Sequence, residues 1–182
     1  MVPAARLEPS AALVQSDMMR YFLDTEYDGF GGALLSIALV PEDGGEEFYA
    51  VIAHDGVSDP WVERYVVPFL NMVPGALQQP ARSRAEISRD LSKWLLREHD
   101  AQSLVHFPHP VDALHIVADW PEDIAQICML LIKGPGALEQ IPPLSFHFVD
   151  LPGFSTAANS AVPHNALHDA RALRDHIMNH LE

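Results

Sequence analysis

The chain has 182 residues, of which 48% are hydrophobic and 20% charged, and its formal net charge at pH 7 is −14. This composition is ordinary for a globular protein and is sufficient for one domain with a hydrophobic core. No apolar run is long enough to span a membrane, and 25 acidic against 11 basic residues argue against a protein that coats nucleic acid through its charge. An acidic protein still attracts phosphate locally where metal ions neutralise a carboxylate site.

The amino-terminal segment lacks the continuous apolar stretch of a secretory signal. We expect residues 1–18 to be a flexible leader and residues 19–182 to form a single domain. Cys128 is the one cysteine, which excludes an internal disulfide and favours a reducing, cytoplasmic location. Because it lies in the apolar segment IAQICMLLI, we predict a buried structural thiol.

Three strands are predicted at the start of the domain. The first covers residues 20–24, and two more cover residues 33–41 and 46–53. The last two flank Asp43-Gly44, and an Asp-Gly step between two apolar runs is a strong hairpin signal. Together these strands predict an antiparallel meander.

Two helices follow. Asp59 before Pro60 is typical of a helix start, and Pro68 interrupts the short helix that results. Ser83 and Glu86 have the spacing of a capping box ahead of an apolar stripe of helical period, which predicts a second, longer helix.

The remaining segments alternate between strand and helix. Strands are predicted over residues 113–119 and 144–150, and helices over residues 120–132 and from His164 to Leu181. A meander followed by strand–helix crossovers predicts an α/β fold. Its mixed five-stranded sheet would contain three antiparallel and two parallel strands, with helices on its faces.

The first strand ends on two acids. Asp24 and Glu26 are two residues apart, so in a strand their side chains lie on the same face. Two like charges held together raise each other's pKa unless a cation lies between them. The pair is therefore either a solvated strand end or half of a metal site.

More acids are predicted to approach the same edge of the sheet. Asp123 lies in the first turn of the helix over residues 120–132, while His164 and Asp169 lie near the start of the last helix. Sites on α/β sheets favour the carboxyl ends of parallel strands, so these side chains should converge if the last two strands run parallel to the first. Four carboxylates suit Mg²⁺ or Mn²⁺, and two such ions with a histidine to accept a proton suit phosphodiester hydrolysis.

Three short stretches carry a family resemblance. LDTEYDG, ADWPEDIAQI and HNALHDAR resemble the three motifs of the DEDDh 3′-5′ exonucleases, which have a ribonuclease H-like fold. The resemblance implies that His164 is the general base and that nucleoside 5′-monophosphates are released from the 3′ end. It also implies two Mg²⁺ or Mn²⁺ ions bound by Asp24, Glu26, Asp123 and Asp169.

Within that superfamily the chain is most similar to the RNase AS family of polyadenylate-preferring exoribonucleases. This likeness runs from Met19 to about Arg174 through RYFLDTE, LLSIALVPEDG and RSRAEISRDL, and it is poor over residues 130–160. It implies single-stranded RNA as the partner, adenylate-rich RNA included, and a homodimer. An acidic monomer is the alternative for the oligomeric state. No membrane partner is expected.

The second motif departs from the common pattern of an asparagine, an aromatic residue and an aspartate. Here Asp119, Glu122 and Asp123 offer three neighbouring acids. Asp119 and Glu122 have capping-box-like spacing, which favours a structural role for both and leaves Asp123 as the best ligand.

Aromatic residues next to the acids are candidate substrate contacts. Tyr27, Phe30 and Trp120 would stack on the terminal bases, which contributes about 1–3 kcal/mol per base, although core packing explains Trp120 equally well. The motifs do not separate RNA from DNA, since contacts to the ribose 2′-OH make that distinction. A proofreading-type DNA exonuclease acting on single-stranded DNA therefore remains an alternative. So does a non-catalytic ribonuclease H-like domain that only binds a partner.

Overall fold

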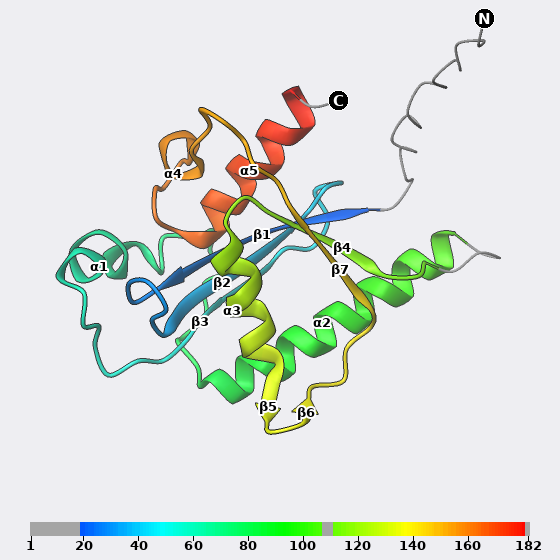
Figure 1. Ribbon diagram of the computed structural model, residues 1–182, viewed down its shortest axis with the longest axis horizontal. Coiled ribbons are helices and arrows are strands. Elements are labelled where there is room, and N and C mark those ends of the chain that lie inside the picture. The colour runs from blue at the N-terminus through cyan, green and yellow to red at the C-terminus, as the bar shows by residue number, and fades with distance from the viewer. Residues whose placement is uncertain (1–18, 107–110, 181–182) are drawn as a thin grey trace, which may run out of the picture.

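Strand β1, Arg20–Tyr27, is the central strand of a five-stranded sheet in the order β3-β2-β1-β4-β7 (Figure 1). The computed structural model describes residues 19–106 and 111–180. Tyr21, Phe22 and Leu23 are at most 1% exposed, because the sheet is covered on both faces where β1 runs. The predicted leader, residues 1–18, lies outside the described residues.

The strand directions match the prediction. Antiparallel pairing joins β1 to β2, Leu34–Pro41, and β2 to β3, Phe48–Val51. On the other side of β1, the strands β4, Leu114–Ala118, and β7, Leu144–Phe148, run parallel to it. The predicted α/β arrangement, a mixed five-stranded sheet of a meander plus two parallel strands, is therefore confirmed.

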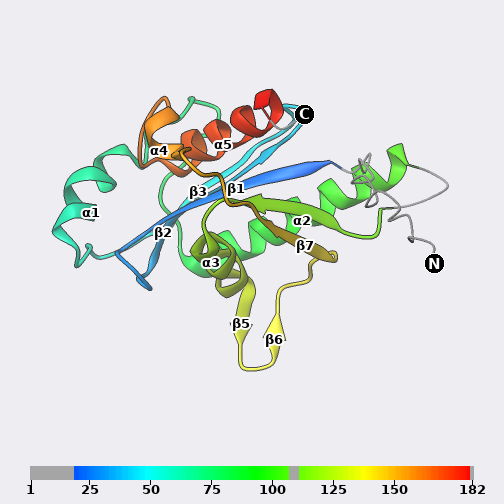
Figure 2. The same ribbon diagram turned by 45° about the horizontal axis from the view of Figure 1, so that its top comes forward.

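Helices pack on both faces of the sheet, as Figure 2 shows. One face of β1 packs with α2, Arg84–Val105, and α3, Pro121–Leu131, while the other packs with α1, Pro60–Tyr65, and α5, Ala166–His180. This follows from the alternation of side chains along a strand, which sends Leu23 to one core and Phe22 to the other. Burial of such a side chain stabilises the fold by about 1.5–3 kcal/mol.

The predicted helix starts at Asp59 and Ser83 are confirmed. The Asp59 side chain accepts a hydrogen bond from the Trp61 backbone N–H at 2.8 Å. Ser83 and Glu86 cap each other through Glu86 N to Ser83 Oγ, 3.3 Å, and Ser83 N to Glu86 Oε2, 3.0 Å. Beyond α1 the chain continues as a 3₁₀ turn, η1, Val67–Phe69, around Pro68.

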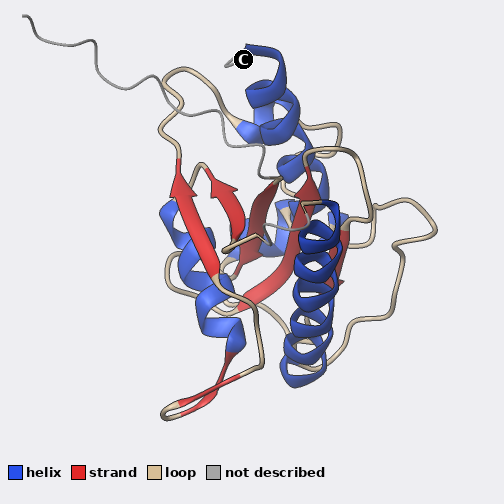
Figure 3. Ribbon diagram, turned by 90° about the vertical axis from the view of Figure 1, so that its right-hand side faces the viewer, coloured by secondary structure: helices blue, strands red, loops and turns tan. Residues whose placement is uncertain are grey.

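Three short elements have no counterpart in the prediction. A hairpin of β5, Ile132–Gly134, and β6, Ala137–Leu138, follows α3 and projects from the body of the molecule (Figure 3). A single-turn helix, α4, Thr156–Asn159, precedes α5. Segments of two to four residues are too short to produce a readable periodicity.

The prediction for Cys128 is wrong, because this side chain is exposed. It lies on α3, where Ile127 and Leu130 face the core and Met129 is 55% exposed. The apolar residues of this segment therefore lie on the outer face of α3 as well as on its buried face. Among the described helices, none combines the length and the apolarity that a membrane crossing requires.

Candidate metal centre

Four elements bring acidic side chains to the carboxyl end of β1. Asp24 and Glu26 lie on β1 itself, Asp123 in the first turn of α3 and Asp169 in the first turn of α5. The fourth element is the segment after β4, which adds Asp119. Ligand atoms lie within 4.8 Å of one another in each of two groups: the aspartate group, Asp24, Asp119 and Asp123, and the histidine group, Glu26, His164 and Asp169.

The two groups are electrostatically connected through Asp24. Burial is the largest cause of its raised pKa, and the charges of Asp123, Glu26, Asp169 and Asp119 raise it further. Burial followed by the charges of Asp169 and Asp123 raises the pKa of Glu26 to about 9. These carboxylates cannot all be ionised near neutral pH without a compensating positive charge.

The pKa values of Asp123 and Asp169 are also raised. Burial raises the pKa of Asp123 to about 7 and that of Asp169 to about 6, even though hydrogen bonds from Thr25 and from Ser160 and His164 act against the shift. Burial also raises the pKa of Asp119. Desolvation is thus the common cause, and it disfavours the charged form of every acid in the cluster.

Within the aspartate and histidine groups, two buried carboxylate oxygens lack a hydrogen-bond partner among the described residues. These are Asp24 Oδ2 and Asp169 Oδ1, on side chains that are 7% and 3% exposed. Leaving a buried charged acceptor unsatisfied costs at least about 1–3 kcal/mol, so a ligand that supplies positive charge is the natural complement. Carboxylate oxygens are the donors that Mg²⁺ and Mn²⁺ prefer, so these residues fit such ions.

Thr25 fixes the orientation of Asp123. Asp123 Oδ1 accepts hydrogen bonds from Thr25 N at 3.1 Å and from Thr25 Oγ1 at 2.5 Å. The parallel pairing of β4 with β1 ends at Phe22, which leaves the Thr25 N–H free to make this contact. Asp123 therefore contacts the strand that carries Asp24 and Glu26, because β4 no longer pairs with β1 at this point.

The capping-box interpretation of Asp119 and Glu122 is wrong. The residue that caps α3 is Trp120, which makes no side-chain capping bond. Asp119 instead joins the aspartate group, half-buried, and Glu122 Oε1 accepts a hydrogen bond from Gly31 N at 2.7 Å. The position of Asp119, directly after a parallel strand, was the signal that sequence reasoning passed over.

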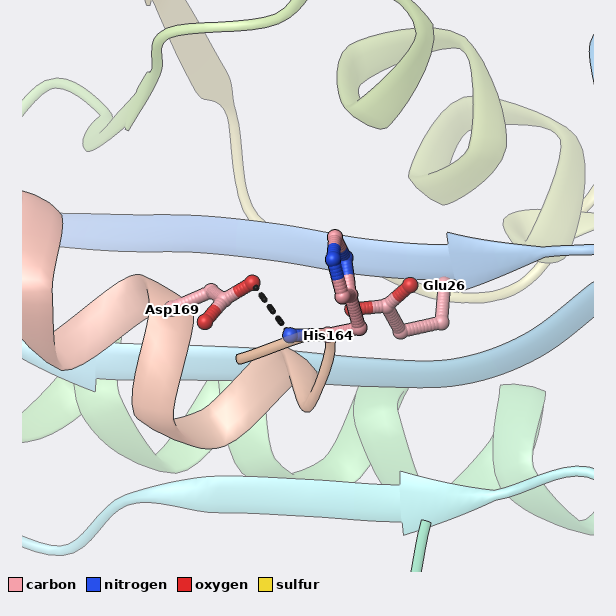
Figure 4. Close-up of side chains that lie close together, drawn as sticks. All are labelled: Glu26, His164 and Asp169. Carbon is pink, nitrogen blue, oxygen red and sulfur yellow. Dashed lines mark hydrogen bonds between the residues drawn. The ribbon is translucent and has the colours of Figure 1, made fainter. Parts of the chain in front are cut away.

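His164 lies outside the final helix, contrary to the prediction, because α5 begins at Ala166. Its φ of 61° is a left-handed conformation that few residues other than glycine adopt. The His164 N–H donates to Asp169 Oδ2 at 3.2 Å, and His164 lies between Asp169 and Glu26 in Figure 4. Burial lowers the pKa of the imidazole, which favours its neutral form.

Asn165 anchors this turn. The side chain is fully buried, and its Nδ2 donates to the Phe69 carbonyl at 2.7 Å. Its Oδ1 accepts from the Leu167 N–H at 3.2 Å, which satisfies a free amide of the first turn of α5. The left-handed backbone of His164 is thus held by Asn165, whose side-chain amide nitrogen and oxygen are both hydrogen-bonded.

An open cleft of about 350 Å³ borders the histidine group, and Glu26 is one of its lining residues. Tyr27, Phe30 and Trp120 also line it. Phe30 is 94% and Trp120 54% exposed, so the core-packing alternative for Trp120 is wrong. The cleft has a further wall, Trp61 of α1, which sequence reasoning did not single out.

Comparison with known proteins adds little to this geometry. No family model matches the chain, and no curated protein matches it. A solved structure described as a 3′-exonuclease in 3′-end specific recognition of the histone mRNA stem-loop is 10% identical, with a TM-score of 0.48, and a full-length 3′-exonuclease is 12% identical, with a TM-score of 0.43. Each similarity covers 90% of this chain and 80% of the other. The function therefore has to be judged from the residues of the site.

Proposed function

We propose that the chain is a metal-dependent 3′-5′ exoribonuclease of the DEDDh type that degrades single-stranded RNA to nucleoside 5′-monophosphates. The observation that carries this proposal is the convergence of the aspartate and histidine groups, with buried carboxylate oxygens that lack partners. The motif resemblance to the RNase AS family makes adenylate-rich RNA the first substrate to test. It also implies a homodimer, and the lone Cys128 favours a cytoplasmic location; both stay predictions.

Four carboxylates would hold two Mg²⁺ or Mn²⁺ ions: Asp24, Glu26, Asp123 and Asp169. Asp119 is a fifth candidate because its carboxylate belongs to the aspartate group. When bound, two such ions stabilise the charge on the attacking and leaving oxygens of a phosphodiester. No lysine or arginine is among the described residues that line the cleft, so the acids depend on those ions to attract phosphate.

His164 is the proposed general base. Its imidazole shares a group with Glu26 and Asp169, and burial lowers its pKa, which favours the neutral form that accepts a proton from water. The His164 N–H bond to Asp169 couples the position of the base to that of a carboxylate. A positioned base of this kind contributes about 10²–10⁴-fold to the rate.

The exposed aromatic side chains of the cleft would bind the terminal nucleotides. Phe30 and Trp120 are exposed to solvent, and Tyr27 lines the same cleft. Base stacking on an aromatic ring contributes about 1–3 kcal/mol and tolerates every base, which suits a single-stranded substrate. Stacking of this kind requires unpaired bases, because paired bases are already stacked on their neighbours.

Product analysis tests the proposal. RNA labelled at the 3′ or the 5′ end, as poly(A) and as mixed sequence, is incubated with Mg²⁺, with Mn²⁺ and with a chelator. We expect labelled mononucleotide from the 3′-labelled strand at once and a shrinking ladder from the 5′-labelled strand, with no products in chelator. Internal cleavage, or product formation in chelator, would contradict the proposed mechanism.

The two alternatives are separated in the same assay. Matched DNA oligomers of equal length decide between RNA and DNA, and a strong preference for DNA would replace the RNA assignment. Binding of RNA without any metal-dependent hydrolysis would favour a non-catalytic binding domain. Asp24→Asn is the control, because it removes one proposed ligand with little change in side-chain volume.

A further inference from the structure

Trp61 of α1 contacts the proposed general base directly. The centroids of the Trp61 and His164 rings are 4.8 Å apart, with planes at 81°, which is an edge-to-face contact. Within residues 19–106 and 111–180, the ring nitrogens of His164 make no hydrogen bond. Packing, rather than hydrogen bonding, therefore decides how this imidazole is oriented, and Trp61 is an aromatic partner in that packing.

Trp61 is itself held by Asp28, the residue that directly follows the strand carrying the acids. Asp28 lies two residues beyond Glu26, and its carboxylate accepts hydrogen bonds from Ser58 N at 2.7 Å and Asp59 N at 2.9 Å. The Asp59 carboxylate in turn accepts from Trp61 N at 2.8 Å. These bonds tie the first turn of α1 to the end of β1.

The other side of Trp61 packs on its own helix. Its ring lies 5.4 Å from the ring of Tyr65, one helical turn further along α1. The Arg64 guanidinium lies over the Tyr65 ring at 5.2 Å from its centroid. Although Trp61 is 49% exposed, it is thus held between α1 and His164 rather than free in solvent.

We propose that Trp61 is a positioning residue that keeps the His164 imidazole directed toward Glu26 and Asp169. This inference rests on the proposed function, because it assigns Trp61 a role through His164. It differs from base stacking, the role proposed for Phe30 and Trp120, because base stacking affects substrate binding. Loss of positioning lowers the turnover of substrate that is already bound.

Kinetics of Trp61→Ala and Trp61→Phe separate the two roles. We expect Trp61→Ala to lower kcat about two- to tenfold with little change in KM, the loss that corresponds to one aromatic contact, and Trp61→Phe to restore most of kcat. Trp120→Ala is the matched control, since it removes an exposed ring from the same cleft without touching His164. For that control we expect a higher KM. A raised KM with unchanged kcat in Trp61→Ala would overturn the positioning role.

An NMR measurement tests the contact without relying on activity. The ring protons of His164 shift when a neighbouring aromatic ring is removed, and the His164→Asn spectrum assigns them by their disappearance. We expect these signals to move in Trp61→Ala, to return toward wild type in Trp61→Phe, and to stay in place in Trp120→Ala. Unmoved signals in a folded Trp61→Ala would overturn the inference. If the alanine variant does not fold, Trp61→Leu provides the same comparison, because leucine removes the ring and keeps an apolar side chain of intermediate size.

The outcomes also separate this inference from the proposed function. A wild-type protein without metal-dependent hydrolysis would overturn the proposed function, and the role of Trp61 with it. If the wild type is active and Trp61→Ala has the same kcat, the role of Trp61 alone would be overturned.

Discussion

Thr25 donates both its backbone N–H and its hydroxyl to one carboxylate oxygen of Asp123. Thr25 lies between Asp24 and Glu26, so the strand that supplies two acids also positions the third. The second oxygen of Asp123 then remains available to a ligand. This relationship links α3 to β1 at the point where β4 no longer pairs with β1, while β2 still pairs on the other side.

Thr25→Val removes the hydroxyl donor and keeps the strand. Groups that orient a metal ligand typically change metal affinity or activity by about 10–100-fold, so we expect a rise of about tenfold in the Mg²⁺ concentration needed for half-maximal hydrolysis. Thr25→Ser retains the hydroxyl and should stay close to wild type. Equal Mg²⁺ requirements for Thr25→Val and wild type would show that Asp123 needs no such orientation.

Asp24→Asn should abolish hydrolysis and raise the melting temperature of the metal-free protein. The reason is that Asp24 is buried among four other acids, and the amide removes one source of repulsion. Thermal unfolding in chelator and an RNA hydrolysis assay measure the two effects. Asp55→Asn is the control because Asp55 is exposed, and it should change neither. A melting temperature that falls in Asp24→Asn would be inconsistent with a repulsive cluster.

The stability of the metal-free protein should decrease as the pH rises. The pKa values of Asp169, Asp123 and Glu26 are raised to about 6, 7 and 9, so the folded state keeps protons that the unfolded chain has already released. Stability is therefore greatest near pH 4–5 and is lost progressively up to about pH 9. Melting temperatures in chelator from pH 5 to 9 measure this trend.

Divalent ions should reverse that pH trend. Mg²⁺ or Mn²⁺ binds the ionised carboxylates of the folded chain and so stabilises it most where those groups have lost their protons. We expect the melting temperature to rise on metal addition at pH 8 and to change little at pH 5. An equal rise at both pH values would count against binding by the raised-pKa acids.

His164→Asn should lower kcat by about 10²–10⁴-fold while the protein still binds Mn²⁺. Asparagine tolerates the left-handed backbone that this position has, so the turn before α5 should be preserved. Single-turnover hydrolysis gives the rate, and calorimetry gives the Mn²⁺ affinity. Activity close to wild type would remove His164 from the role of base.

Asp119→Asn tests the acid that sequence reasoning assigned to a helix cap. We expect weaker Mn²⁺ binding in Asp119→Asn, because the carboxylate belongs to the aspartate group. Glu122→Gln is the comparison, since Glu122 contacts Gly31 and is not in either group. Calorimetric titration of both variants should rank Asp119→Asn as the weaker binder, and the reverse order would return Asp119 to a structural role.

Much of the fold follows from local patterns. Ser83 and Glu86 lie within one helical turn, and Asp43-Gly44 closes a hairpin between neighbouring strands, so short-range energetics decides both. The alternation that places Asp24 and Glu26 on one face is equally local. These features were predicted correctly because each depends on a few consecutive residues.

Other features depend on partners that are distant in the sequence. The left-handed turn at His164 is held by Asn165 through Phe69, which lies 96 residues from Asn165. The exposure of Trp120 and Cys128 depends on which surfaces the rest of the chain leaves uncovered.

By itself, therefore, the sequence determined the order of the elements, the sheet to which they belong and the acids that converge at the end of β1. Tertiary structure alone decided that Asp119 joins those acids and that Trp61 lies against His164. The physical reason is that backbone propensity and hydrophobic period act over a few residues, whereas the contacts of a site are set by how whole helices and strands pack.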